Sequence, residues 1–152
     1  MRAFGHHCIT KKISPGNPLA NTIVYIPAMA QGSSEAFAGG VVAYSNELKQ
    51  ALLDVPEAVL ARHGAVSAET AAAMAAGARA RLGADAAVAV TGIAGPGGGT
   101  EDKPVGLVHL HVSSPAGDDV RRMDIPGSRD SVRGRAATAA LQLLRAHLVT
   151  HS

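Results

Sequence analysis

The sequence predicts a protein of the α/β class, with a mixed sheet between helices. A continuous apolar run at 86–90 is typical of a central strand that is covered on both faces. Helical segments with capping residues stand on both sides of this run along the chain. Strand patterns at 105–113 and 119–125 follow each other closely, as in a hairpin, so we expect the sheet to be mixed.

Length and composition indicate one domain without membrane spans. With 152 residues, 47% of them hydrophobic, the chain is long enough to bury a core. It contains no apolar run of the roughly 20 residues that cross a bilayer. The formal charge of +2 and the scattered arginines do not form the basic face of a nucleic-acid-binding protein. Because Cys8 is the only cysteine, an intrachain disulfide is excluded, and we expect a reducing, cytoplasmic environment.

The first 30 residues differ from the rest in composition. Isoleucine and lysine are concentrated there, whereas the rest of the chain is rich in Ala, Gly, Val and Arg. Three prolines interrupt this segment: Pro15, Pro18 and Pro27. We therefore expect 1–21 to be loop or poorly ordered, 22–26 to form a short strand, and 31–152 to be the main domain.

A strand and two helices are expected next. The segment 38–44 suits a buried strand after a glycine turn, and Ser45 can cap the helix that follows. The expected buried stripe of this helix is Leu48, Leu52 and Leu53. Pro56 opens a second, short helix, which Gly64 ends.

Two longer helices complete the pattern. Ser67 is expected to cap a helix over 68–82, with an inner face of Ala71, Met74, Ala75, Ala78 and Leu82. The last two strands are joined by a turn at Gly117-Asp118, and Ser128 caps a final helix over 129–148. Its inward positions are Val132, Ala136, Ala140, Leu143, Leu144 and Leu148.

The connection 91–104 is the most informative feature. A loop of about fourteen residues is uncommon in a compact domain and is often functional. Glycine lets its backbone approach a ligand closely, as in phosphate-binding loops. It lacks a Gly-Lys-Ser/Thr ending and a strand follows it, which disfavours ATP and Rossmann interpretations. A flexible hairpin connection is the alternative. The candidate binding residues are Thr91, Gly92, Ile93, Ala94, Gly95, Pro96, Gly97 and Gly98.

Polar residues also crowd the junction between the strand at 38–44 and its helix. Tyr44 and Ser45 lie there, and Lys49 follows one helical turn later, on the same face as Ser45. A lysine near apolar walls loses its preference for the charged form and can act as a general base. The alternative is an exposed lysine on an ordinary amphipathic helix.

Charged and imidazole side chains elsewhere give weaker indications. Arg129 and Arg133 share a face of the last helix and could clamp a phosphate, or could form a solvated surface. His109 and His111 alternate on one strand face, but two ligands without a third are a weak metal signature. His6, His7 and Cys8 are equally well explained as an irregular terminus.

Four segments together resemble one family. They are GSSEAFAGGVVAYSNELKQALLDV, HGAVSAETAAAMAAGAR, DAAVAVTGIAGPGGGTEDKPVGLVHL and RDSVRGRAATAAL, in this order over about 31–148. They are similar to the C-terminal domain of CinA, which is also found as a stand-alone nicotinamide-nucleotide amidohydrolase. The resemblance implies a three-layer α/β/α fold, an oligomer, and a small-molecule nucleotide substrate.

The same resemblance implies a reaction and its residues. The carboxamide of nicotinamide mononucleotide is hydrolysed to nicotinic acid mononucleotide and ammonia, a step of pyridine-nucleotide salvage that calls for no metal or organic cofactor. Lys49 matches the family's base, flanked by Tyr44 and Ser45. The 91–98 loop, Arg129 and Arg133 would line the nucleotide site, since a phosphate suits backbone N–H groups and arginine.

The chain departs from the family at the nucleophile. A Glu-Ser-Cys-Thr-Gly-Gly motif should lie near 14–18, where this sequence has Ser-Pro-Gly-Asn-Pro. We therefore expect the family's first strand and helix to be replaced. A catalytic serine would have to lie about 3 Å from Lys49, with Ser14, Ser33, Ser34 and Ser45 as candidates. The alternatives are a non-catalytic nucleotide-binding or interaction protein and a degenerate family member that folds poorly.

Overall fold

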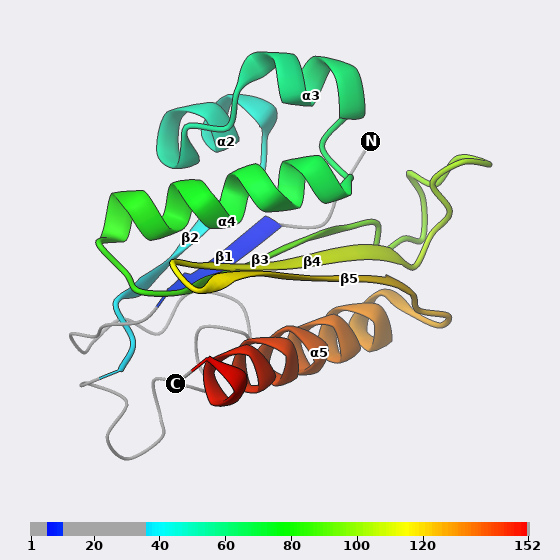
Figure 1. Ribbon diagram of the computed structural model, residues 1–152. Helices are drawn as coiled ribbons and strands as arrows, with labels where there is room; N and C mark the ends of the chain where they lie inside the picture. The colour runs from blue at the N-terminus through cyan, green and yellow to red at the C-terminus, as the bar shows by residue number, and fades with distance from the viewer. Residues whose placement is uncertain (1–5, 11–35, 152) are drawn as a thin grey trace.

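The computed structural model describes residues 6–10 and 36–151, which form a sheet between two layers of helices (Figure 1). The strands are β1 (His6–Thr10), β2 (Gly39–Ala43), β3 (Ala87–Gly92), β4 (Leu107–Ser114) and β5 (Gly117–Asp124), in the spatial order β2-β1-β3-β4-β5. The predicted α/β class and the helix–sheet–helix layering are confirmed. The sheet is not mixed, however, because each described pairing is antiparallel.

The strand β1 corrects the expectation that 1–21 forms a loop. It lies between β2 and β3 and runs antiparallel to both, although its sequence, HHCIT, shows no clear alternation. A five-residue strand that is bonded on both sides can be held by its neighbours' backbone groups rather than by its own pattern. The short strand expected at 22–26 and the family's first helix lie outside the described residues.

Three helices lie on one side of the sheet, and one helix covers the other side (Figure 1). The first side carries α2 (Asn46–Leu53), α3 (Glu57–His63) and α4 (Ala68–Leu82), with α4 closest to the sheet and the other two over α4, and the second carries α5 (Arg129–Thr150). The predicted caps are confirmed: the hydroxyls of Ser45, Ser67 and Ser128 accept hydrogen bonds from backbone N–H groups in the first turns of α2, α4 and α5. Within the described ranges, no helix combines the length and the apolar character that a membrane span needs.

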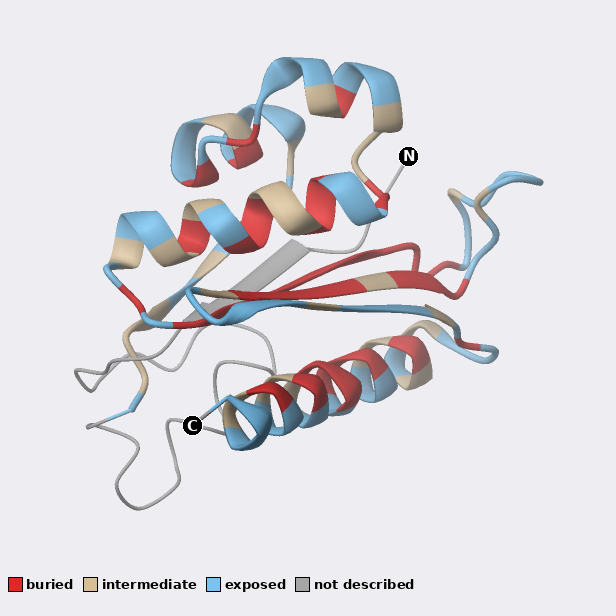
Figure 2. Ribbon diagram, in the orientation of Figure 1, coloured by how far each residue is buried: buried red, intermediate tan, exposed pale blue. Residues whose placement is uncertain are grey.

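Alternation along β3 and β4 divides the core between the two faces. Valines and leucines point toward α5, whereas Ala87 and Ala89 point toward α4 and α2. The small residues allow close approach: a β-carbon on Gly77 of α4 would collide with the carbonyl of Leu53 in α2. Figure 2 shows the resulting pattern, with buried residues lining the inner sides of α4 and α5.

Three expectations about burial and turns are corrected. In α2 the buried residues are Lys49 and Leu53, while Leu48 and Leu52 are 41% and 42% exposed. The expected inward residues Leu82 and Leu148 are only half-buried, whereas Leu144 is half-buried but packs against the core as expected. The β4–β5 turn is formed by 115–116, so Gly117 and Asp118 already belong to β5.

Candidate functional site

The carboxyl ends of β2 and β3 lie at the same end of the sheet. We call this end, where both strands lead into loops, the loop edge. Both strands run antiparallel to β1, so they share a direction. Ala43 at the end of β2 pairs with His6, and Val90 near the end of β3 pairs with the adjacent His7. The loop edge therefore carries the β2–α2 junction on one strand and the glycine-rich loop on another. The helices α4 and α5 also begin at this end of the sheet (Figure 1).

Lys49 is the buried cation of this region. Its side chain is only 1% exposed, and its Nζ donates a hydrogen bond to the backbone carbonyl of Ser45 at 3.3 Å. Burial lowers the pKa of Lys49 to about 8, and the nearby Glu47 carboxylate only partly opposes this. A lysine with such a pKa is neutral in an appreciable fraction of molecules near neutral pH, and its neutral amine can accept a proton.

The hydroxyl of Ser45 is engaged elsewhere. It accepts a hydrogen bond from the backbone N–H of Leu48 at 3.2 Å, which makes it the N-cap of α2. Within residues 6–10 and 36–151, the hydrogen bond of Lys49 Nζ goes to the Ser45 carbonyl and not to a hydroxyl. Tyr44 is half exposed beside this junction. The other candidate serines, Ser14, Ser33 and Ser34, lie outside the described residues.

The glycines of the 91–104 loop fall into two groups. A β-carbon on Gly92 would lie 2.7 Å from the carbonyl oxygen of Leu107, and one on Gly95 would lie 2.6 Å from a methyl group of Val105. These two glycines are therefore needed for the loop to pack against its own returning strand. A β-carbon on Gly97 would meet nothing within 4 Å. The backbone is therefore open at Gly97, while Gly98 beside it is half-buried, and this tip is the part of the loop that we expect a ligand to reach.

The first half of the loop is buried, and the tip is exposed. The buried residues are Thr91, Gly92, Ile93, Ala94 and Gly95, and Pro96 and Gly97 are exposed. The hydroxyl of Thr91 donates to the carbonyl of Ala65 at 2.6 Å, which ties the base of the loop to the α3–α4 connection. The hairpin interpretation of 91–104 is thus correct for its connectivity, but hydrogen bonds fix the loop at both ends.

The structure brings one of the two predicted arginines to the loop. Arg129, the first residue of α5, donates from Nη1 to the carbonyl of Gly95 at 3.0 Å. Arg133 is half-buried one turn later and lies 3.9 Å from the Asp130 carboxylate. Arg129 therefore supports the loop, and its guanidinium places positive charge beside the loop tip.

A polar cluster that the sequence analysis missed lies next to the loop. Lys103 donates from Nζ to the carbonyl of His63 at 2.7 Å, and the ring of His63 lies 3.5 Å from the Glu69 carboxylate. The imidazole of His109 lies close enough to Glu69 and Lys103 to interact with their charges. Burial, together with the charge of Arg122, lowers the pKa of His109 below its usual range. The antiparallel pairing of His109 with Thr91 could have indicated this position once the hairpin was assumed.

As the sequence predicted, His109 and His111 share one face of β4. This face looks toward α4. His111 is buried, and its Nε2 lies 3.2 Å from a carboxylate oxygen of Asp118. Each histidine therefore has its own acidic or basic neighbours, and the structure gives the pair no common third ligand among the described residues.

Comparisons with known proteins agree with this architecture. The profile of the CinA C-terminal domain matches residues 19–148. A CinA-like protein from Parasynechococcus marenigrum is 55% identical over 131 residues, which cover 86% of this chain and 29% of that protein. A CinA-like protein from Mycolicibacterium paratuberculosis is 57% identical over 119 residues, covering 75% of this chain and 27% of that protein.

Solved structures give the same result. The competence-damaged protein (CinA) superfamily protein from Escherichia coli superposes with a TM-score of 0.77 at 30% identity, covering 80% of this chain and 71% of that one. The competence/damage inducible protein CihA from Agrobacterium tumefaciens gives a TM-score of 0.66 at 45% identity, covering 68% of this chain and 64% of that one. The matched region spans less than a third of the length of the CinA-like proteins from Parasynechococcus marenigrum and Mycolicibacterium paratuberculosis.

Proposed function

Because the chain belongs to the CinA C-terminal domain family, we propose that it hydrolyses the carboxamide of nicotinamide mononucleotide to nicotinic acid mononucleotide and ammonia. The observation that carries the proposal is the buried Lys49, whose pKa is lowered to about 8 at the same sheet edge as the glycine-rich loop. An amine in this state is suited to remove a proton from a nucleophile and to return it to a leaving group.

The proposed reaction runs through an acyl-enzyme. A serine oxygen attacks the carboxamide carbon while its proton passes to the neutral amine of Lys49. The tetrahedral intermediate then collapses, the C–N bond breaks, and the nitrogen leaves as ammonia after taking the proton from Lys49. Water hydrolyses the resulting ester with the same lysine as base, which releases the carboxylate and restores the serine hydroxyl.

The loop edge supplies groups that suit the substrate's phosphate. The exposed backbone at Gly97, with the half-buried Gly98 next to it, offers N–H donors, and Arg129 provides a positive charge beside the loop tip. The proposal includes a small nucleotide as substrate, association into a homo-oligomer and a cytoplasmic setting. It requires no metal or organic cofactor for the reaction.

Nucleotide binding without hydrolysis is the second candidate. It is favoured by the engagement of the Ser45 hydroxyl as a helix cap and by Ser-Pro-Gly-Asn-Pro at the place of the nucleophile motif. The direction of β1 also favours it. Thr10 pairs with Ala87 and Gly39, so the chain leaves β1 at the edge opposite Lys49.

Two measurements on the same preparation separate the candidates. Purified protein is incubated with nicotinamide mononucleotide and ammonia release is followed, while calorimetry measures binding of the nucleotide. Release of ammonia in step with nicotinic acid mononucleotide is the result expected for the amidohydrolase. Binding without release would assign the chain to the second candidate. If the protein neither binds the nucleotide nor releases ammonia, both candidates are contradicted.

A further inference from the structure

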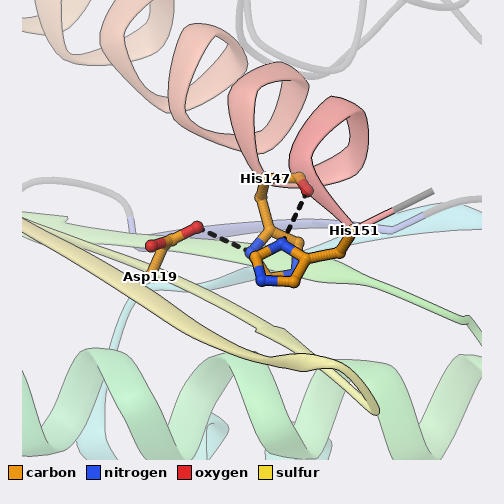
Figure 3. A group of neighbouring side chains, drawn as sticks. All are labelled: Asp119, His147 and His151. Atoms are coloured by element: carbon orange, nitrogen blue, oxygen red, sulfur yellow. Dashed lines mark hydrogen bonds and ion pairs between the residues drawn. The ribbon is translucent and has the colours of Figure 1, made fainter.

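A second group of titratable side chains lies at the end of the sheet opposite the loop edge, away from Lys49. Asp119 of β5 meets His147 and His151, four residues apart near the end of α5 (Figure 3). One ligand atom from each of the three residues lies within 4.8 Å of the others. The carboxylate and the two imidazoles come from different layers of the fold, and nothing in the proposed amidohydrolase site uses them.

Both ring nitrogens of His147 are placed by hydrogen-bond partners. The ring is buried, with Nδ1 2.7 Å from Oδ2 of Asp119 and Nε2 2.7 Å from Oγ of Ser114. Ser114 Oγ accepts from the backbone N–H of Ala116 and can give its own proton to the carbonyl of Gly117, each at 3.1 Å. Ser114 can therefore accept a proton from Nε2 of His147, which is the tautomer in which Nδ1 can bind a metal ion.

The ring of His151 is oriented in a corresponding way. Its Nδ1 lies 2.9 Å from the carbonyl oxygen of His147, to which it can only donate, so the neutral ring carries its lone pair on Nε2. The two rings lie with their centroids 4.5 Å apart. The spacing of four residues places both imidazoles on one face of the helix end.

We propose that Asp119, His147 and His151 bind a divalent transition-metal ion, with Zn²⁺ as the best match. Two imidazoles and one carboxylate are a donor set that zinc accepts, with water in the fourth position. Histidine ligands usually donate their other ring N–H to a fixed acceptor, and here Ser114 and the His147 carbonyl are those acceptors. Ligand atoms in a tetrahedral zinc site lie about 3.3 Å apart, so binding requires the exposed His151 to move inward and the 2.7 Å contact between His147 and Asp119 to widen.

The ion would take the place of a proton. In the metal-free protein, Nδ1 of His147 is engaged in its 2.7 Å hydrogen bond with Asp119, and a bound ion would replace this hydrogen bond by bridging the two atoms. Bound metal would fasten the last turn of α5 to β5. This proposal is independent of the amidohydrolase activity, since the two sites lie at opposite edges of the sheet.

Calorimetric titration of the full chain with ZnCl₂ tests the site. The expected result is that His151→Ala and Asp119→Asn each bind one equivalent of Zn²⁺ fewer than the wild type, while the neighbouring exposed Thr150→Ala binds the full number. Ser114→Ala should keep the equivalent but weaken its affinity about 10- to 100-fold, because it removes only the acceptor behind His147.

Thermal unfolding with Zn²⁺ provides a second readout. The melting temperature of the wild type should rise with zinc, and that rise should be smaller in His151→Ala, whose exposed side chain can be removed without disturbing the core. Equal zinc stoichiometry and affinity in the wild type, His151→Ala and Asp119→Asn would overturn the proposal, as would a wild type that binds no zinc.

Discussion

The ammonium group of Lys49 donates a hydrogen bond to the backbone carbonyl of Ser45, 3.3 Å away, while its side chain is almost completely buried. One neutral acceptor does not replace the hydration of a full charge, so burial lowers the pKa of this lysine to about 8. The contact with the Ser45 carbonyl therefore positions the amine in the first turn of α2, and burial keeps it neutral often enough for proton transfer.

Replacing this lysine with an apolar residue should stabilise the fold. The pKa of Lys49 is about 8 in the folded state and 10.5 as its ordinary value, so the unfolded chain binds the extra proton between these limits. The free energy of unfolding should therefore rise as pH increases from 8 toward 10.5. Lys49→Met should remove this slope and add about 1–2 kcal/mol at pH 7, measured by urea unfolding at several pH values. A wild-type stability that falls over this pH range would contradict the assignment.

Removing the cap of α2 should affect stability more than chemistry. Ser45→Ala loses the hydrogen bond to the Leu48 N–H and should cost about 1 kcal/mol, as should the matched change Ser128→Ala at the start of α5. Ammonia release by Ser45→Ala should fall less than tenfold, because Lys49 is held by the backbone carbonyl of residue 45. A loss of about a thousandfold or more would instead identify Ser45 as the nucleophile.

Two glycines of one loop should respond differently to alanine. Gly92→Ala places a methyl group 2.7 Å from the Leu107 carbonyl, and should destabilise the protein by about 1–3 kcal/mol. Gly97→Ala meets nothing within 4 Å and should leave the unfolding free energy within about 0.5 kcal/mol of the wild type. If Gly97→Ala also weakens nucleotide binding in calorimetry, the loop tip is part of the binding surface. Equal destabilisation of both variants would contradict the distinction between a tightly packed Gly92 and an open Gly97.

The arginine at the start of α5 should matter for substrate binding. Arg129→Ala loses the contact to the Gly95 carbonyl and a positive charge at the loop, and should raise KM for nicotinamide mononucleotide about tenfold. Arg135→Ala, which changes an exposed arginine on the same helix, is the control and should leave KM unchanged. Similar KM values for both variants would show that Arg129 does not contact the substrate.

Local sequence rules predicted much of this fold. The serine caps of α2, α4 and α5 lie where the sequence placed them, because N-capping depends on a few adjacent residues. The apolar run at 86–90 became β3, which is buried throughout. The expected position of Lys49 at a strand–helix junction is correct. The sequence left open whether this lysine lies near apolar walls or on an exposed helix face, and the structure shows that it is buried.

Long-range pairing could not be predicted. The inward face of α2 was expected at Leu48, Leu52 and Leu53, and only Leu53 is buried there, because packing against α4 turns Lys49 inward in place of the other two. Nothing in residues 6–10 indicates a strand between β2 and β3, since that position depends on partners more than 30 residues away. The contact of Asp119 with His147 likewise joins residues 28 positions apart in different layers.

The pH dependence of kcat for ammonia release, compared among the wild type, Lys49→Ala and Lys49→Arg, tests the central claim most directly. Gln50→Ala, a change at the neighbouring half-buried position, serves as the control for the fold. We predict that wild-type kcat rises with a single ionisation near pH 8, that Gln50→Ala keeps this profile, and that both Lys49 variants lose activity, since arginine stays protonated. Activity in Lys49→Arg with an unchanged pH profile would contradict a role for Lys49 as the general base.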